Sequence, residues 1–572
     1  MIKHSKTSWL CLASLCLLVA GAPAAAANFT TGSSQALRFG VHELTFTGNG
    51  GVADPFATTA TVTFTPPSGM AVTTEMFWDG SNTWRARAYV TETGMWKWSS
   101  NAASDPGLDR KSGEFIAGPS DLRGKLKPHP SNPRALVTDN GQWFAPIGDT
   151  AYYMFDSKNY QDYVRDDWNH GVNFLRCSAF GHLRDFNAHF TMQNPDGIPV
   201  LASLQSDDAQ LKWMLENYPG MFLQYIMLPE NPAVGWSKVS VTAKNQLLQQ
   251  MVARYAAFPT LTWQIMNDSF YQKKDAGNVA IAHGIGAFLV AHDVYGHLRS
   301  TGARRSQGAP FADSAWTSFL HFETKDALAA DEADANALSN KFTWCGEDRY
   351  ETYIPPIHKS YFFRRLMWAW LLSGGSACYG GDWDATIPYE RTGFSGLDSV
   401  QFIKGYFESR HIDLGKFIYQ DRLAADPLAT GKDRPQSCNN GTSEYIIYHP
   451  NAAGAGADAN VHASRTAAFS IDLCAASGVF QIEWFRCLDG VTAQGGTVDG
   501  GAVRTLTAPW PAQDVVCRLT AGTRNTGGNP LQRRSNATRK RDGIHALTGM
   551  QNNFSDTADI PLEKKPEQNS GI

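Results

Sequence analysis

The sequence lacks the signatures of several common protein classes. Its 50 Lys and Arg residues are balanced by 54 Asp and Glu residues, so the formal net charge of −4 gives no basic excess for nucleic acid. Beyond the N-terminus, no run reaches the ~18 apolar residues that a membrane helix needs. There is no C-x-x-C pair for a zinc ribbon, no Gly-rich phosphate loop and no G-x-S-x-G elbow. The apolar content of 43% excludes a mostly disordered chain.

The N-terminus reads as a targeting segment. Lys3 and Lys6 precede an apolar run over 9–20, and small residues then offer a cleavage site near 22–26. We therefore predict a signal peptide over 1–27 and a secreted or periplasmic protein.

Cysteine is scarce, with nine residues, two of which fall in the predicted signal peptide. Disulfides are permitted in an exported protein, and the four C-terminal cysteines offer two bridges in any of three connectivities. The three mid-chain cysteines lie on apolar, strand-like runs and are expected to be buried thiols. These mid-chain residues are Cys177, Cys345 and Cys378.

Hydrophobic patterning divides the chain into three folded parts. Short alternating strands with Gly, Pro and Asn turns precede residue 121 and predict a β-sandwich. About eight strand–helix units follow and predict a (β/α)₈ TIM barrel, with its first strand at 143–148 and its fifth within 298–306. The predicted divisions are signal peptide 1–27, N-terminal Ig-like sandwich 28–120, barrel 121–415, C-terminal sandwich 416–521 and disordered polar tail 522–572.

Two carboxylates follow apolar strands of the predicted barrel. Asp268 comes after the run 260–266, and Glu347 comes after the run 341–345. The carboxyl ends of barrel strands meet at one mouth, and a pair of carboxylates across a scissile bond is what glycoside hydrolysis requires. The alternative is structural, with Asp268 capping the next helix or turn and Glu347 pairing with Arg349.

Other polar side chains gather at predicted strand ends and suit a hydroxyl-rich ligand. For each of them the alternative is a structural hydrogen bond or salt bridge, and Asp149 has the further alternative of a helix cap. The candidate substrate-binding residues are Asp149, His182, Arg184, Asn267, His321, Tyr350, Glu351 and Trp383. No metal and no organic cofactor is expected.

Several motifs resemble the apiosidase-like glycoside hydrolase family. The resemblance covers the first-strand run ending in Gly148-Asp149-Thr150, the run 262–268 ending in Asp268, and the segment 346–351, which matches "Gly-Glu-x-x-Tyr-Glu". The flanks resemble the sandwich that often precedes such barrels and a β-domain, sometimes labelled as collagen-binding, that often follows them. The resemblance implies that Asp268 is the acid/base and Glu347 the nucleophile of a retaining enzyme. Met266-Asn267 and Ser269 depart from the family pattern around the acid, so apiose specificity is not carried over.

We therefore expect a glycoside hydrolase that acts on a polysaccharide or oligosaccharide, with no nucleic-acid partner. The 17 Trp residues fit sugar stacking, although aromatic side chains also fill β-rich cores. The alternatives are a non-catalytic carbohydrate-binding protein on a barrel core and a surface adhesin that binds through its flanking sandwiches. The sugar, the linkage and the oligomeric state are open at this point.

Overall fold

The computed structural model describes most of the chain between residues 27 and 522. The described ranges are 27–179, 199–228, 236, 239–267, 276–302, 308–323, 340–351, 360–381, 395–420, 422–429, 433–453 and 462–522. The predicted signal peptide, apart from residue 27, and nearly all of the predicted tail lie outside these ranges. Within them, no helix combines the length and the apolar character needed to cross a membrane.

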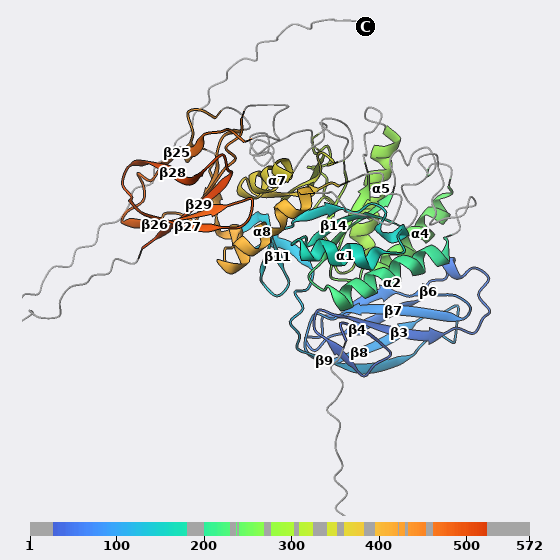
Figure 1. Ribbon diagram of the computed structural model, residues 1–572. Helices are drawn as coiled ribbons and strands as arrows, with labels where there is room; N and C mark the ends of the chain where they lie inside the picture. The colour runs from blue at the N-terminus through green and yellow to red at the C-terminus, as the bar shows by residue number, and fades with distance from the viewer. Residues whose placement is uncertain are drawn as a thin grey trace, which may run out of the picture. The chain divides into compact units, whose positions relative to one another are not determined.

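Two β-sheets form the N-terminal part (Figure 1). Their strands alternate buried and more exposed residues, as in β4, where Val62 and Phe64 point into a core that also holds Trp96 and Phe115. One sheet has the order β1-β3-β7-β6, with β1 Phe29–Thr31, β3 Val41–Thr47, β7 Thr83–Tyr89 and β6 Phe77–Trp78. The other has the order β2-β9-β8-β4-β5, with β2 Gln35–Leu37, β9 Ser112–Gly118, β8 Gly94–Asn101, β4 Thr61–Thr65 and β5 Val72–Glu75. The 3₁₀ turn Pro55–Ala57 lies between β3 and β4.

A small antiparallel sheet leads into the barrel. It consists of β10 Leu126–His129, β11 Asn132–Thr138 and β12 Trp143–Phe144. The predicted first barrel strand at 143–148 is therefore wrong, because Trp143–Phe144 pairs with β11 and the barrel begins with β13 at Gly148–Thr150. Pro146 lies between the two segments and has no amide hydrogen to continue a ladder.

The central sheet has eight strands in the order β17-β16-β15-β14-β13-β20-β19-β18, and every described pairing in it is parallel. All residues of β14, β15 and β16 are buried, as expected for parallel strands covered on both faces. Between β17 and β18 the amide of Ser318 donates to the carbonyl of Arg299 at 2.8 Å, so the sheet is a nearly closed barrel. The strands are β13 Gly148–Thr150, β14 Phe174–Ser178, β15 Phe222–Leu228, β16 Leu261–Met266, β17 Arg299–Ser300, β18 Leu320–Glu323, β19 Thr343–Glu347 and β20 Gly375–Tyr379. The fifth strand falls inside the predicted window.

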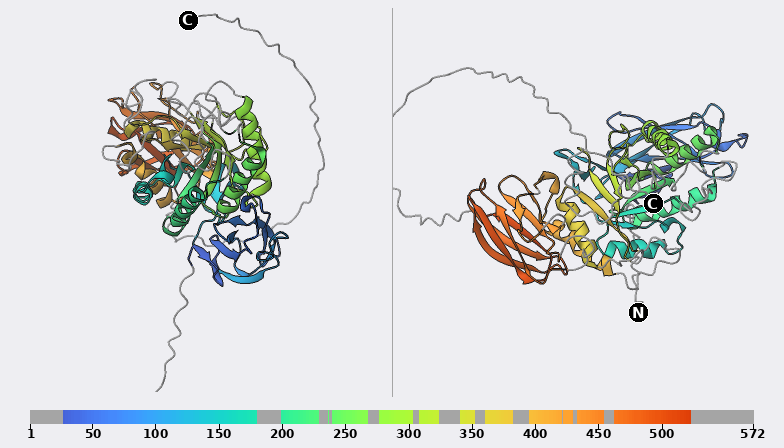
Figure 2. Two further views of the ribbon diagram at one scale, coloured as in Figure 1. Left: turned by 90° about the vertical axis from the view of Figure 1, so that its right-hand side faces the viewer. Right: turned by 90° about the horizontal axis from the view of Figure 1, so that it is seen from above.

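Helices alternate with these strands and cover the outside of the barrel (Figure 1). The helices among the described residues are α1 Tyr160–Asn169, α2 Leu201–Asn217, α4 Val241–Tyr255, α5 Ala276–His292, α7 Ser360–Leu372 and α8 Ser395–Ser409, with 3₁₀ turns at Met154–Asp156 and Leu414–Lys416. Helix α7 is covered on all sides: every residue after Ser360 is buried, and these include two charged side chains, Arg364 and Arg365. It contacts β20 on one side and β23 and β24 on the other, and the right-hand view of Figure 2 shows the C-terminal strands next to the helices in yellow.

The C-terminal part again holds two sheets. A six-stranded sheet has the order β21-β23-β24-β29-β26-β27, with β21 Ile418–Tyr419, β23 Gln436–Asn439, β24 Glu444–His449, β29 Val515–Ala521, β26 Val479–Arg486 and β27 Thr492–Asp499. A three-stranded sheet joins β22 Ala424–Ala425, β25 Thr466–Asp472 and β28 Val503–Pro511. No disulfide joins any of the seven cysteines after the signal segment, all of which are described. The expected mid-chain thiols are buried, and the two bridges offered by the C-terminal cysteines do not form.

Candidate active site

The carboxyl ends of three barrel strands bring polar side chains together, and a side chain from a fourth strand reaches them. Glu323 ends β18, Glu347 ends β19 and Asn267 directly follows β16. Arg176 reaches them from the middle of β14. Because all these strands run parallel, the cluster lies at the end of the barrel where catalytic groups of this fold are found.

Arg176 is the centre of this cluster. Its side chain has no exposed surface, and its Nη1 lies 3.0 Å from Oε2 of Glu347 while its Nη2 lies 3.3 Å from Oε1 of Glu323. The guanidinium also donates to Tyr152 Oη, to Asn267 Oδ1 and, at 3.2 Å, to Gln264 Oε1. Burial opposes the charge of Arg176, but the neighbouring acidic groups outweigh it and raise its pKa well above the ordinary value. The site therefore holds a permanent positive charge.

Glu347 is held as a carboxylate that still reaches solvent. Its Oε2 accepts hydrogen bonds from Arg176 and from the hydroxyl of Tyr152. A guanidinium at hydrogen-bond distance favours the ionised form of a carboxyl group. The side chain of Glu347 keeps 13% of its surface exposed, so the arginine pairing does not seal it from a ligand.

A chain of polar contacts links Trp344, Gln224 and His321 to Glu323 of this cluster. Trp344 donates to the amide oxygen of Gln224 at 3.0 Å, and the Gln224 amide nitrogen lies 3.0 Å from Nδ1 of His321. Since an amide nitrogen can only donate, His321 accepts at Nδ1 and carries its proton on Nε2, which lies 3.4 Å from Glu323. Burial, helped by the charge of Arg176, lowers the pKa of His321 well below its usual value, so the ring is neutral.

Gly346 is required by this packing. A Cβ at Gly346 would lie 2.1 Å from Cε1 of His321, closer than any side chain permits. The glycine before Glu347 therefore lets the histidine of β18 lie flat against β19.

The two remaining residues of the "Gly-Glu-x-x-Tyr-Glu" segment are anchored. The hydroxyl of Tyr350 lies 3.3 Å from that of Tyr152, and only 3% of Tyr350 is exposed. Glu351 accepts from the hydroxyl of Tyr379 at 2.6 Å and from the amide of Gly396 at 2.9 Å. Glu351 thereby joins the end of β19 to β20 and to the start of α8.

Asp149 lies inside β13 rather than after it. It has no exposed surface and accepts a hydrogen bond from Tyr163 of α1 at 2.9 Å. This contact holds α1 on the barrel, and a direct contact between Asp149 and substrate stays a prediction.

Apart from Asp149, which contacts Tyr163, the predicted site residues divide into two groups. The structure brings Asn267, His321, Tyr350 and Glu347 into one connected network, with Glu351 beside it. Asp268, His182, Arg184 and Trp383 lie outside the described residues.

Reasoning from sequence missed Arg176, Tyr152 and Glu323. A signal for Arg176 was present, because an arginine inside a buried apolar strand needs a paired charge. Glu323 follows an apolar run in the same way as Glu347 does. The argument that a carboxylate after an apolar barrel strand lies at the mouth therefore also applied to Glu323. Tyr152 carries no comparable pattern.

Comparison with solved structures places the fold among known glycoside hydrolase structures. A protein of Bacteroides vulgatus ATCC 8482, named provisionally as a glycoside hydrolase, matches with a TM-score of 0.67 at 17% identity, over 85% of this chain and 100% of that chain. A family 5 glycoside hydrolase from the same organism matches with a TM-score of 0.56 at 16% identity, over 70% of this chain and 94% of that chain. A third structure, named glycoside hydrolase, matches with a TM-score of 0.55 at 15% identity, over 70% and 97%. At these identities the likeness shows the fold alone.

Sequence comparisons add one short match. Residues 35–103 match a family model described as a domain of unknown function, DUF5060. This range falls within the two N-terminal sheets and covers a small part of the chain. No curated protein matches the chain.

Proposed function

We propose that this protein is a glycoside hydrolase that cleaves a polysaccharide or its oligosaccharides with Asp268 and Glu347. The observation that carries the proposal is that Arg176 hydrogen-bonds both Asn267 and Glu347. Asn267 is the immediate neighbour of Asp268 in the chain. One buried guanidinium thus ties the end of β16, which leads into Asp268, to the end of β19, which presents Glu347.

Each residue then has a distinct role. Glu347, ionised beside Arg176, attacks the anomeric carbon, and Asp268 protonates the departing oxygen before it activates water in the second step. In a retaining enzyme the two carboxyl groups are about 5–5.5 Å apart, whereas about 6.5–9.5 Å leaves room for a water and inverts the anomeric centre. The resemblance of the Glu347 segment favours the retaining arrangement. Tyr152 holds the carboxylate in place as negative charge leaves it.

The two roles are tested separately by measuring kcat of a variant at each residue on substrates with different leaving groups. The purified chain is screened against a panel of polysaccharides with products identified by mass, and the variants are assayed on the polymer that is cleaved. We expect Glu347→Gln to lose at least about 10³-fold in kcat on every substrate, because no nucleophile remains. We expect Asp268→Asn to lose a similar factor on natural linkages but far less on aryl glycosides whose leaving group needs no proton.

The control is Glu114→Gln, which changes an exposed glutamate of the N-terminal sheet and should keep the parent rate. A Glu347→Gln variant that turns over at the parent rate would end the assignment of Glu347. If the parent binds glycans and releases no product from any polymer, the alternative of a non-catalytic carbohydrate-binding protein holds instead.

A further inference from the structure

A pocket of about 410 Å³ lies at the opposite end of the barrel from Glu347. Its lining includes Ile147 and Asn173, which precede strands β13 and β14, whereas Glu347 ends its strand. A second hollow of about 180 Å³ shares Arg123, Asn173 and Lys404 with it. The two together form one groove, which we call the floor groove, in the size range of small-ligand sites.

Aromatic side chains lie along the floor groove. Trp143 is half-buried in the larger pocket, where its ring packs edge-on against Phe407 at a centroid distance of 5.4 Å. Trp168 is half-buried in the smaller hollow, with the ammonium of Lys404 over its ring at 4.2 Å. Flat, partly exposed indole rings offer apolar faces against which the C–H faces of a sugar ring can pack.

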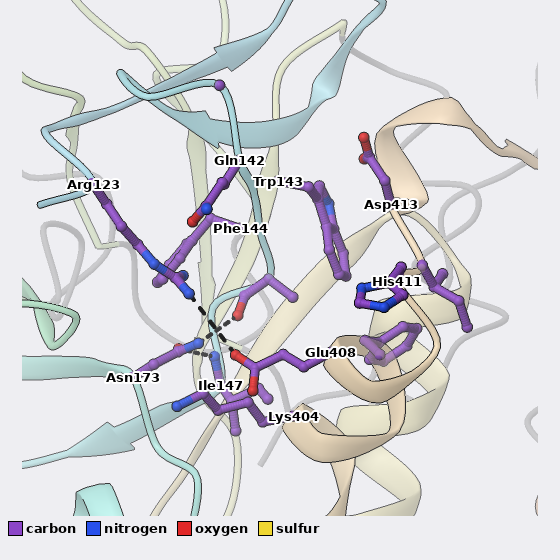
Figure 3. Close-up of a pocket in the computed structure, with 14 residues that line it drawn as sticks. Arg123, Gln142, Trp143, Phe144, Ile147, Asn173, Lys404, Glu408, His411 and Asp413 are labelled. Carbon is purple, nitrogen blue, oxygen red and sulfur yellow. Dashed lines mark hydrogen bonds and ion pairs between the residues drawn. The ribbon is translucent and has the colours of Figure 1, made fainter. Parts of the chain in front are cut away.

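The groove carries charges of both signs. Arg123 and Lys404 are opposed by Glu408, Asp413 and Asp121, and Arg123 lies 3.9 Å from Glu408. Burial, together with the charge of Arg123 and against that of Glu408, lowers the pKa of Lys404. A groove with both signs of charge exerts little net pull on an ion, but it offers donors and acceptors side by side, which is what hydroxyl groups need. Figure 3 shows Trp143 and His411 on one side of the pocket and Arg123 and Asn173 on the other.

His411 adds an independent observation. It has a φ of 52°, in the left-handed region that favours glycine, and it follows the last turn of α8. The amide of Ile412 donates to the carbonyl of Phe407 at 3.0 Å and that of His411 to Glu408 at 3.2 Å, which is the helix-ending pattern in which glycine usually occupies the position of His411. The chain bears conformational strain at this position and gains an imidazole in the wall of the pocket.

We propose that the floor groove is a second, non-catalytic binding site for a neutral oligosaccharide segment. Trp143 stacks on a sugar ring, while Glu408, Arg123 and His411 hydrogen-bond its hydroxyl groups. The site goes beyond the proposed hydrolytic function, because binding here involves none of the groups at the barrel mouth. In a polysaccharide hydrolase it would hold the polymer while the mouth acts on another stretch of it.

Electrophoresis of the full chain through gels that contain soluble polysaccharides tests this site without requiring turnover. Neutral β-glucan, xylan, galactomannan and starch are compared with polygalacturonate and alginate. We expect at least one neutral polymer to retard the parent, and we expect Trp143→Ala to weaken its apparent affinity at least about fivefold, since the stacking face is lost. Glu114→Ala, on an N-terminal sheet, should be retarded by the polymer as much as the parent is, each compared with its own mobility in a gel without polymer.

His411→Gly separates binding from folding. Glycine relieves the left-handed backbone, so this variant should melt no lower than the parent, yet it should bind the same polymer about threefold more weakly because one hydrogen bond is lost. If Trp143→Ala fails to fold, His411→Gly alone decides the matter. Retardation by no neutral polymer, equal retardation of the parent and the variants, or stronger retardation by the acidic polymers would each overturn the proposal.

These outcomes do not depend on catalysis. If the protein hydrolyses no polymer but Trp143→Ala removes its retardation, the floor groove is a binding site and the proposed hydrolytic function is wrong. If the protein hydrolyses a polymer but its retardation does not depend on Trp143 or His411, the proposed hydrolytic function stands and the proposed binding site in the floor groove is wrong.

Discussion

Arg176 holds a positive charge where no solvent reaches it, between Glu323 and Glu347. Such an arrangement is stable only while every partner is present, because a buried ion without its counter-charge costs far more than the pair contributes. The same guanidinium fixes the direction of the Glu347 carboxylate. Its contribution to folding and its contribution to the candidate chemistry are therefore linked.

Substitution of Arg176 separates these two contributions. Arg176→Met should lower the free energy of unfolding by roughly 3–5 kcal/mol and reduce kcat at least about 100-fold, because Glu323 and Glu347 lose the guanidinium that pairs with both of them. Arg176→Lys keeps the charge but not the planar fork, so it should recover part of the stability and little of the rate. Urea unfolding and turnover of the two variants measure this, and a methionine variant as stable as the parent would contradict it.

Residue by residue, the sequence predicted which polar side chains lie at the strand ends better than it predicted their hydrogen bonds, and the catalytic and binding roles of these residues stay predictions. Glu347 and His321 were found because barrel strands end in functional groups, and the network contains both. Arg176 was missed because its importance depends on register, namely on which side chains of β14 point into the barrel opposite β19. A single sequence shows that a strand is buried, but it does not show which residues of distant strands share a layer.

At the scale of elements, predictions succeeded where a periodic pattern was long. The pattern over 160–170 predicts a helix, and α1 is found at Tyr160–Asn169; the apolar run 260–266 predicts the fourth strand, which is found at Leu261–Met266. The first strand failed because two short apolar pieces on either side of Pro146 read as one run. Packing, rather than local pattern, assigned one piece to the antiparallel sheet and the other to the barrel.

Helix α7 joins the barrel to the C-terminal sheets through buried charges. Arg364 forms a two-point contact with Asp514, with both distances at 2.8 Å, and His462 lies 3.0 Å from the same carboxylate. Burial alone would raise the pKa of Asp514, but Arg364 and His462 outweigh it and hold the pKa well below the usual value. Neither Arg364 nor Asp514 has more than 1% of its side chain exposed.

We expect Asp514→Asn to destabilise the chain by roughly 3–5 kcal/mol, because the variant leaves Arg364 buried without its counter-charge. The matched control is Asp162→Asn, which removes an ion pair to Arg165 that lies largely in solvent, and this change should cost less than about 1 kcal/mol. Thermal and urea unfolding of both variants provide the comparison. Equal effects from the two substitutions would show that the α7 contact is not a buried-charge interface.

At the scale of the whole molecule, charged side chains also fasten the N-terminal sheets to the barrel. Arg87 of β7 contacts Glu43 of β3 at 2.7 Å and Asp208 of α2 at 2.5 Å, and Arg254 of α4 contacts Asp79 at 3.0 Å. Neighbouring acidic groups outweigh burial and raise the pKa of Arg87. These contacts attach the N-terminal sheets to the helices of the barrel, and they place buried charged groups where the two parts meet.

His42, next to Glu43 in β3, makes the N-terminal sheets sensitive to acid. Burial lowers its pKa to about 4 against the attraction of Glu43, and its ring stacks on Phe115 at a centroid distance of 3.9 Å. In the unfolded chain the histidine takes up a proton near pH 6.5, so below that pH the unfolded state binds more protons than the folded state and stability falls. Between pH 7 and pH 5 this one residue should cost about 2 kcal/mol of unfolding free energy.

His42→Gln keeps a polar partner for Thr30, whose hydroxyl lies 2.9 Å from Nδ1 of His42, but it removes the titration. Urea unfolding at pH 7 and at pH 5 should therefore show a smaller loss of stability in the variant than in the parent, by about 2 kcal/mol. The variant can be less stable than the parent at pH 7, since it loses the stacked ring, and still satisfy this expectation. An identical pH dependence in the two proteins would mean that His42 is already protonated in the fold, and that the acid sensitivity of the molecule arises elsewhere.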